Sequence, residues 1–233
     1  MLQNFMTQWL YISDYDTALD QAFISKAKIN GVDLEQRYIA VVLSGDQRRM
    51  PEHRLALNLD TKRRIYVLSV EGVQPFLDAL APDIFAGVGG AHFDISTGIK
   101  EALFAVLLTN EFERVVIFNR VGYLYDLVKS DLGYPNVAAY YERIDDETWL
   151  TFWEYVQHLS STKETACLML VHPKTIVYRL NKICATTGLN PKQGVDLLPL
   201  IVTYVRKQTA CFDNLVNELQ SLSDSLLPRD KVD

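Results

Sequence analysis

The stretch STKETACLMLVHPKTIVYRLNKICATTG, residues 161–188, decides the fold of the second half of the chain. Ser161-Thr162-Lys163-Glu164 has the spacing of a capping box, in which serine caps a helix and glutamate reaches back to the cap. That helix must end before His172-Pro173, because proline disfavours helical backbone in the preceding residue and is tolerated at the first position of a new helix. The stretch therefore predicts a short helix, a tight turn and a longer helix from Pro173 to about Thr186, closed by Gly188, which is a helix-turn-helix.

The longer helix has two faces. Its apolar stripe consists of Ile176, Leu180, Ile183, Cys184 and Thr187. Polar residues recur at helical spacing on another face, where arginine can pair with guanine and lysines can contact phosphates. We predict that the DNA-binding residues are His172, Lys174, Thr175, Tyr178, Arg179 and Lys182. The alternative is that these polar residues form the solvated face of an ordinary helical bundle.

The composition indicates a globular protein of one large or two small domains. The chain has 233 residues, of which 48% are hydrophobic and 22% charged. The sequence contains no apolar run of the roughly 18 residues that a membrane span needs, and its first residues do not resemble a signal peptide. We therefore expect a cytoplasmic protein with no membrane partner. Three cysteines, an odd number without paired spacing, predict neither a disulfide framework nor a zinc motif.

Charge is distributed unevenly along the chain, and this changes what the net charge implies about nucleic-acid binding. The net charge is −6, whereas DNA-binding domains are usually basic. Residues 159–210 hold seven basic and two acidic residues, a net charge of +5, which leaves −11 for the remainder. This split predicts a basic DNA-binding module within an acidic protein.

Upstream of this module, helical and strand patterns alternate. Apolar spacing predicts helices over 14–30, 74–80 and 96–109, strands over 38–43, 83–88 and 114–118, and a hairpin over 55–70. After residue 133 only helical periods remain. The predicted fold class is α+β, an α/β domain with a central sheet followed by an all-α helix-turn-helix domain. We predict domains over 1–133 and 134–210 and a helical extension over 211–233.

The helix-turn-helix stretch resembles the C-terminal domain of the PucR/CdaR family of bacterial transcriptional regulators, which control purine catabolism and sugar-diacid use. The family pattern TA-x-x-L, H-R-N-T-x-x-Y-R-L and T-G is matched at Ala166, His172, Thr175, Tyr178, Arg179, Leu180 and Gly188, and Leu168 lies one position before the leucine of the first motif. Pro173-Lys174 departs from the usual Arg-Asn, which removes one basic contact at the start of the helix. The resemblance implies a transcriptional regulator that reads the major groove of double-stranded DNA with helix 173–186.

The first half of the chain resembles, less specifically, the degenerate GGDEF-like central domain of the same family. Active cyclases carry glycines and an acidic pair at a hairpin turn, whereas the matching hairpin here reads Leu57-Asn58-Leu59-Asp60-Thr61-Lys62. We therefore expect no enzyme activity. Residues 87–92 (GVGGAH) fail the dinucleotide-binding pattern and predict only a strand-to-helix turn. The sugar-diacid sensor of one branch of the family is not expected in this chain.

No cofactor or metal site is predicted, because the four histidines are scattered and have no ligand spacing.

The C-terminal segment contains a short heptad seam, formed by Phe212, Leu215, Leu219, Leu222 and Leu226. This seam is consistent either with a homodimer contact or with a terminal helix folded back on its own domain. Helix-turn-helix proteins usually act as dimers, so a homodimer is expected. A small-molecule effector of unknown identity is left open. The alternative function is a non-enzymatic small-molecule or protein binding module, in which the helix-turn-helix serves as an interaction surface.

Overall fold

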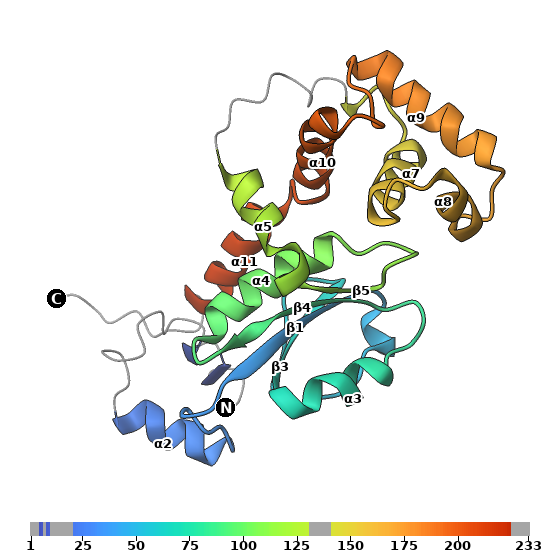
Figure 1. The fold of residues 1–233 in the computed structure, drawn as a ribbon. Coiled ribbons are helices and arrows are strands. Elements are labelled where there is room, and N and C mark those ends of the chain that lie inside the picture. Colours follow the sequence, from blue (N-terminus) through green and yellow to red (C-terminus); the bar gives the residue numbers. More distant parts are fainter. Residues whose placement is uncertain (1–4, 7, 10–20, 131–140, 225–233) are drawn as a thin grey trace. The chain divides into compact units, whose positions relative to one another are not determined.

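The computed structural model describes residues 5–6, 8–9, 21–130 and 141–224 (Figure 1). The chain divides into two compact units, Met1–Gly122 with Cys211–Asp233, and Tyr123–Ala210. The fold is mixed α+β, with a five-stranded sheet in the first unit and only helices among the described residues of the second, which confirms the predicted fold class. The first boundary between the two compact units falls after residue 122, whereas the sequence predicted a boundary after 133. Residues 211–233 are grouped with the first unit.

The sheet of the first unit has the order β2-β3-β1-β4-β5. Its strands are β1 (Tyr38–Ser44), β2 (Ala56–Asn58), β3 (Arg63–Ser69), β4 (Phe85–His92) and β5 (Val115–Ile117). β2 and β3 form the predicted hairpin, and β1 lies antiparallel between β3 and β4. Only β4 and β5 pair in parallel, and the helix between them supplies the long connection that parallel strands need.

Helices cover both faces of this sheet. α4 (Ile95–Leu107) packs on β4 and β1, and α3 (Val73–Asp78) contributes Val73, Phe76 and Leu77 to the apolar cluster of Val41, Tyr66 and their neighbours (Figure 1). The first unit also contains α2 (Gln21–Ile29) and the short 3-10 helices η1 (Gln47–Arg49) and η2 (Val70–Gly72). The predicted helix over 14–30 is described only from residue 21, and its predicted stop at Asn30-Gly31 is confirmed by the positive φ of 67° at Gly31.

Residues 87–92 lie within strand β4, so the predicted strand-to-helix turn is wrong. The glycines instead allow the backbone of α4 to lie close to the backbone of β4. A Cβ atom added at Gly87 would lie 2.1 Å from the carbonyl oxygen of Ala102, and one at Gly89 would lie 2.2 Å from that of Gly98. The strand therefore continues through a glycine-rich segment because the helix backbone packs directly on it.

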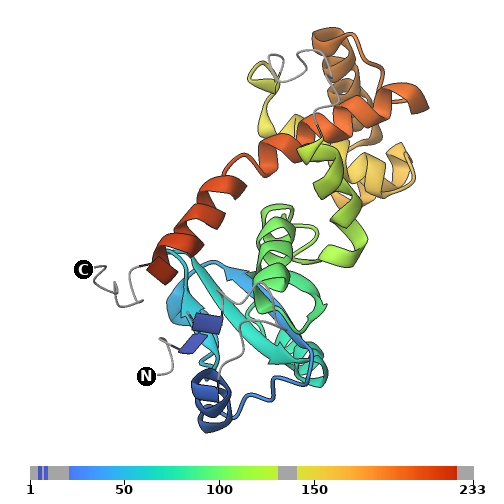
Figure 2. The same cartoon turned by 90° about the vertical axis from the view of Figure 1, so that its left-hand side faces the viewer.

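The C-terminal helix α11 (Phe212–Asp224) packs against α4 of the first unit (Figure 2). The rings of Phe212 and Phe104 lie edge to face, with 5.9 Å between their centroids. Phe212, Leu215 and Leu219 are buried, so these three positions of the predicted heptad seam contact the chain itself. The side chain of Leu222 and the whole of Leu226 lie outside the described residues.

The second unit consists of helices around a core of aromatic and aliphatic side chains. They are the C-terminal part of α5 (Phe118–Lys129), then α7 (Asp146–Gln157), α8 (Thr162–Leu168), α9 (Pro173–Thr187) and α10 (Gly194–Gln208). Trp149 and Phe152 of α7 are fully buried, and Trp153 stacks on Tyr204 of α10 at 4.8 Å between ring centroids. α7 contacts α8, α9 and α10, so it is the central helix of this unit.

Candidate nucleic-acid interface

Helix α8 begins as the sequence predicts. Ser161 is its N-cap, and the serine hydroxyl accepts a hydrogen bond of 3.3 Å from the amide of Glu164. The amide of Ser161 itself donates to the carbonyl of His158 at 3.0 Å, which completes the preceding turn. The reciprocal bond from the Glu164 side chain is therefore not needed, and only half of the predicted capping box forms.

The turn between α8 and α9 is closed by a leucine in the left-handed conformation. Leu170 has φ of 53° and is 92% exposed. The amide of Val171 donates to the carbonyl of Ala166 at 3.0 Å, and the amide of Leu170 donates to that of Cys167 at 3.3 Å. These two bonds form a Schellman motif, a helix ending that normally uses glycine because other residues are strained at positive φ. The sequence signal for this ending is consequently missing.

Helix α9 begins and ends where the sequence predicts. Pro173 occupies its first turn, and Gly188 follows its last residue with φ of 76°. His172 is the N-cap, and its Nδ1 accepts a hydrogen bond of 3.1 Å from the amide of Lys174. The imidazole of His172 therefore has a structural partner, although the residue is exposed and lies beside the start of the helix.

One face of α9 is buried in the second unit, as predicted. Ile176 and Ile183 are 0% exposed and Leu180 is 1% exposed, and α9 contacts both α7 and α8. Full burial of side chains of this size contributes roughly 1.5–3 kcal/mol each. The apolar face therefore fixes which way the rest of the helix points.

Arg179 faces α7 and is held there. Its Nη1 donates to the hydroxyl of Thr151 at 3.0 Å, and its Nη2 forms an ion pair with Glu147. The Arg179 side chain is only 13% exposed. In this arrangement the guanidinium ties α9 to α7 and has no free face with which to pair a base.

Lys182 also contacts α7. Its ammonium lies 2.5 Å from a carboxylate oxygen of Asp145, the N-cap of α7. The hydrogen bond from Lys182 holds the pKa of Asp145 well below its usual range, with a further contribution from Thr148. Both side chains remain substantially exposed, which makes this contact weaker and more sensitive to salt than the one at Arg179.

Three consecutive acidic residues at the start of α7 each pair with a basic residue. Asp145 pairs with Lys182, Glu147 with Arg179 and Asp146 with Lys207 of α10, whose ammonium also lies 3.8 Å above the ring centroid of Tyr141. Across residues 123–210 there are nine basic and nine acidic residues. The basic module predicted over 159–210 is thus neutralised by acids that precede it in the chain.

The exposed face of α9 is a different row of residues, one step around the helix from the predicted polar stripe. Lys174, Tyr178, Asn181 and Ala185 are exposed, and Tyr178 reaches 69%. We call Lys174, Tyr178, Asn181 and Ala185 the solvent row. Thr175, in contrast, is half-buried. Sequence reasoning missed Asn181 and Ala185, although they lie opposite the predicted stripe of Ile176, Leu180 and Ile183.

Three exposed lysines of the second unit, two of them near the turn, make no ion pair with a described residue. Lys163 in the first turn of α8 and Lys174 in the first turn of α9 are exposed and make no ion pair with any residue that the structure describes. Lys192, in the loop before α10, is exposed and likewise has no ion pair among these residues. In the second unit, these three lysines can meet an external anion without first breaking an ion pair with a described residue.

The described parts of the chain contain no cluster of three or more histidine, cysteine or acidic side chains that could hold a metal ion. None of the described helices has the length and apolar character needed to cross a membrane.

A short helix, a tight turn and a longer helix with one buried and one exposed face define a helix-turn-helix domain. The model of the PucR C-terminal helix-turn-helix domain matches residues 149–203, so this part of the second unit is a PucR-type helix-turn-helix. Among solved structures, the chain is similar to a regulator of polyketide synthase expression from Bifidobacterium adolescentis, at 17% identity and a TM-score of 0.33, over 91% of this chain and 98% of that one. A comparison with curated proteins finds no match.

Proposed function

We propose that the second unit binds double-stranded DNA and inserts α9 into the major groove. The observation that carries this proposal is the solvent row, because three of its four residues have polar groups, it follows directly on the turn, and it projects from a helix whose opposite face is buried. Asparagine can form a bidentate pair with adenine, and alanine can contact the methyl group of thymine. Asn181 and Ala185 therefore join Lys174, Thr175 and Tyr178 as the proposed base-reading face.

The remaining predicted residues take other parts in this proposal. His172 caps α9 and orients its first turn, where backbone amides and Lys174 can meet a phosphate. Arg179 and Lys182 position α9 through Glu147 and Asp145. Lys163 and Lys192 supply further phosphate contacts that depend on salt.

The first unit is proposed to be a non-enzymatic, degenerate GGDEF-like domain that regulates the DNA-binding unit. Its β2-β3 turn is built around Asp60, whose carboxylate accepts hydrogen bonds from the amides of Lys62 and Arg63 and pairs with the guanidinium of Arg63. This acid is therefore already paired within its own turn. Homodimerisation on paired half-sites remains part of the proposal, with a surface other than the buried residues of α11.

The proposal is tested by selecting bound sequences from random double-stranded DNA with the full chain. We expect an enriched motif, and we expect Asn181→Ala and Tyr178→Ala each to weaken binding to that motif about 10-fold to 100-fold. Gln157→Ala, on the exposed side of α7, is the matched control and should bind like the wild type. Failure to enrich any sequence, or unchanged affinity of both α9 variants, would favour the alternative, in which the helix-turn-helix is a protein interaction surface.

A further inference from the structure

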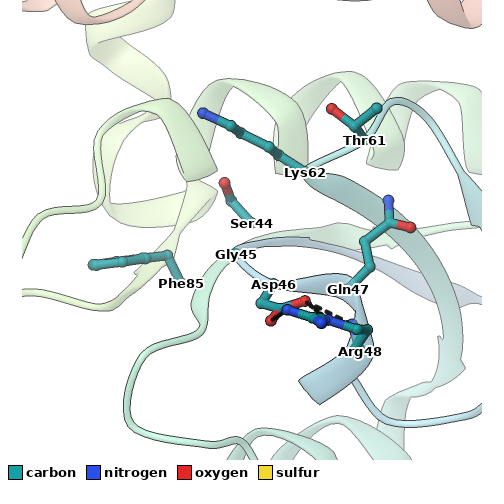
Figure 3. A pocket seen from close by; sticks show the side chains of 8 residues that line it. All are labelled: Ser44, Gly45, Asp46, Gln47, Arg48, Thr61, Lys62 and Phe85. Atoms are coloured by element: carbon teal, nitrogen blue, oxygen red, sulfur yellow. Dashed lines mark hydrogen bonds and ion pairs between the residues drawn. The ribbon is translucent and has the colours of Figure 1, made fainter.

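An open depression of about 640 Å³ lies at one end of the sheet in the first unit. It is bordered by the end of β1, by η1, by the β2-β3 turn and by the start of β4 (Figure 3). Its volume falls in the range of ordinary small-molecule sites. Loops that follow strand ends in this way can present several side chains to one ligand, because the sheet fixes their starting points.

The walls of the depression are held by hydrogen bonds. Strand register places Ser44 directly beside Phe85 of β4 and beside Arg63 of β3. The side-chain amide of Gln47 donates to the carbonyl of Asp60 at 2.5 Å, which ties η1 to the β2-β3 turn. The carboxylate of Asp60 in turn accepts bonds of 2.6 and 2.8 Å from the amides of Lys62 and Arg63. A ligand would therefore enter a preformed site and would not have to order it.

The charge available in the depression is a single positive one. The guanidinium of Arg48 lies 2.8 Å from the carboxylate of Asp46, and this hydrogen bond lowers the pKa of Asp46, so the pair has no net charge at neutral pH. Lys62 makes no side-chain ion pair or hydrogen bond with any residue that the structure describes. Figure 3 shows its ammonium extended on the side of the depression where Ser44 lies.

The remaining groups are two hydroxyls and one aromatic ring. Ser44 and Thr61 line the depression, and neither hydroxyl has a hydrogen-bond partner in the described part of the chain. The ring of Phe85 is half-buried and lies on the far side of Ser44 from Lys62 (Figure 3). The site thus combines one cation, two uncommitted hydroxyls and an apolar surface.

We propose that this depression binds a small aromatic monocarboxylate. The ammonium of Lys62 pairs with the carboxylate, the hydroxyl of Ser44 hydrogen-bonds to it, and the ring packs on Phe85. A polyphosphate would bring several negative charges to a single uncompensated cation, and a neutral ring would leave the lysine unused. The inference goes beyond the proposed function, because it gives the first unit a ligand of defined chemistry.

The test uses the full chain without DNA and three probes, which are 2-naphthoate, the neutral 2-naphthalenemethanol and inorganic phosphate. Saturation-transfer difference NMR should detect 2-naphthoate, and titration should give weaker binding of about 10-fold in Lys62→Ala, the loss expected for one charge-assisted hydrogen bond. Lys100→Ala is the matched control, because Lys100 of α4 is also exposed and makes no ion pair within the described residues. Phe85→Leu should weaken binding while it keeps an apolar side chain in place.

Four outcomes would overturn the proposal. The first three are no saturation transfer to 2-naphthoate, equal affinity of Lys62→Ala and wild type, and equal binding of the neutral alcohol. Displacement of 2-naphthoate by equimolar phosphate would also overturn it, since the ring would then contribute nothing. Because no DNA is present, each result is independent of whether the second unit binds an operator.

Discussion

The two polar sides of α9 have different environments, although both consist of residues that commonly contact DNA. On one side Arg179 and Lys182 are paired with Glu147 and Asp145 of α7. On the other side the solvent row of Lys174, Tyr178, Asn181 and Ala185 is exposed. Helical spacing alone separates apolar from polar faces. It does not separate polar residues that face solvent from polar residues that face another helix.

The difference is energetic as well as geometric. An arginine that is 13% exposed has been moved out of water, so its hydrogen bonds must replace those it made there. A side chain in the solvent row has no such requirement in the free protein and keeps its hydrogen-bonding capacity for a partner. Substitutions on the two sides should therefore affect different measurements, stability on one side and binding on the other.

The largest expected effect is that of Arg179→Ala. Loss of the guanidinium leaves the hydroxyl of Thr151 and the carboxylate of Glu147 without their common partner and should lower the stability of the second unit by about 2 kcal/mol. Hydrogen exchange of the backbone amides of α7 and α9 should accelerate accordingly. Lys192→Ala is the control and should exchange like the wild type. Unchanged exchange together with lost DNA binding would instead make Arg179 a direct DNA contact.

A smaller effect, on the salt dependence of DNA binding, is expected to differ between Lys174 and Lys182 of α9. Lys174→Ala should lower the slope of log affinity for DNA against log salt by about one, because an unpaired charge on a phosphate releases one counterion. Lys182→Ala should lower the slope by less, since the charge of Lys182 is already balanced by Asp145. Binding titrations at several salt concentrations give both slopes. Equal changes would mean that Lys182 leaves Asp145 for a phosphate when DNA binds.

The smallest effect concerns pH. Because Lys182 lowers the pKa of Asp145 in the folded protein, the ionised carboxylate adds stability above the unfolded pKa of about 4, and this stability is lost as the pH falls through the lower folded pKa. Asp145→Asn keeps an oxygen to cap the amide of Thr148 but removes the charge. Urea unfolding should therefore show a wild-type advantage at pH 7 that shrinks towards pH 3. If the wild-type advantage is instead constant across this range, it comes from the cap on Thr148 and not from the ion pair with Lys182.

The limits of α9 could be predicted because proline, glycine and the cap act within a few residues of the chain. Pro173 and Gly188 determine the two ends of the helix whatever packs against it. The pairing of Arg179 and Lys182 with α7 could not be predicted in the same way, because Glu147 and Asp145 are more than 30 positions away from these partners. Asn181 and Ala185, in contrast, lie opposite the predicted apolar stripe, whose position already indicates that they are exposed.

The first unit gives the same contrast between local and long-range causes. The strands around β1 follow from short runs of β-branched and aromatic residues, and the sequence predicts their positions closely. The continuation of the strand through residues 89–92 could not be predicted, because glycines usually indicate a turn and only the packing of α4 explains them. The position of α11 is likewise a matter of long-range packing, here of Phe212 on Phe104.

The acidic residues at the start of α7 have a consequence for protein engineering. A recognition helix is often treated as a cassette that can be exchanged between relatives to transfer sequence preference. Here Asp145 and Glu147 are bound to α9, and Asp146 between them is bound to α10. A graft of residues 173–187 alone would bring new side chains to carboxylates selected for Arg179 and Lys182. The transferable unit is therefore α9 together with the first turn of α7, two segments that are separated in the sequence and must be exchanged together.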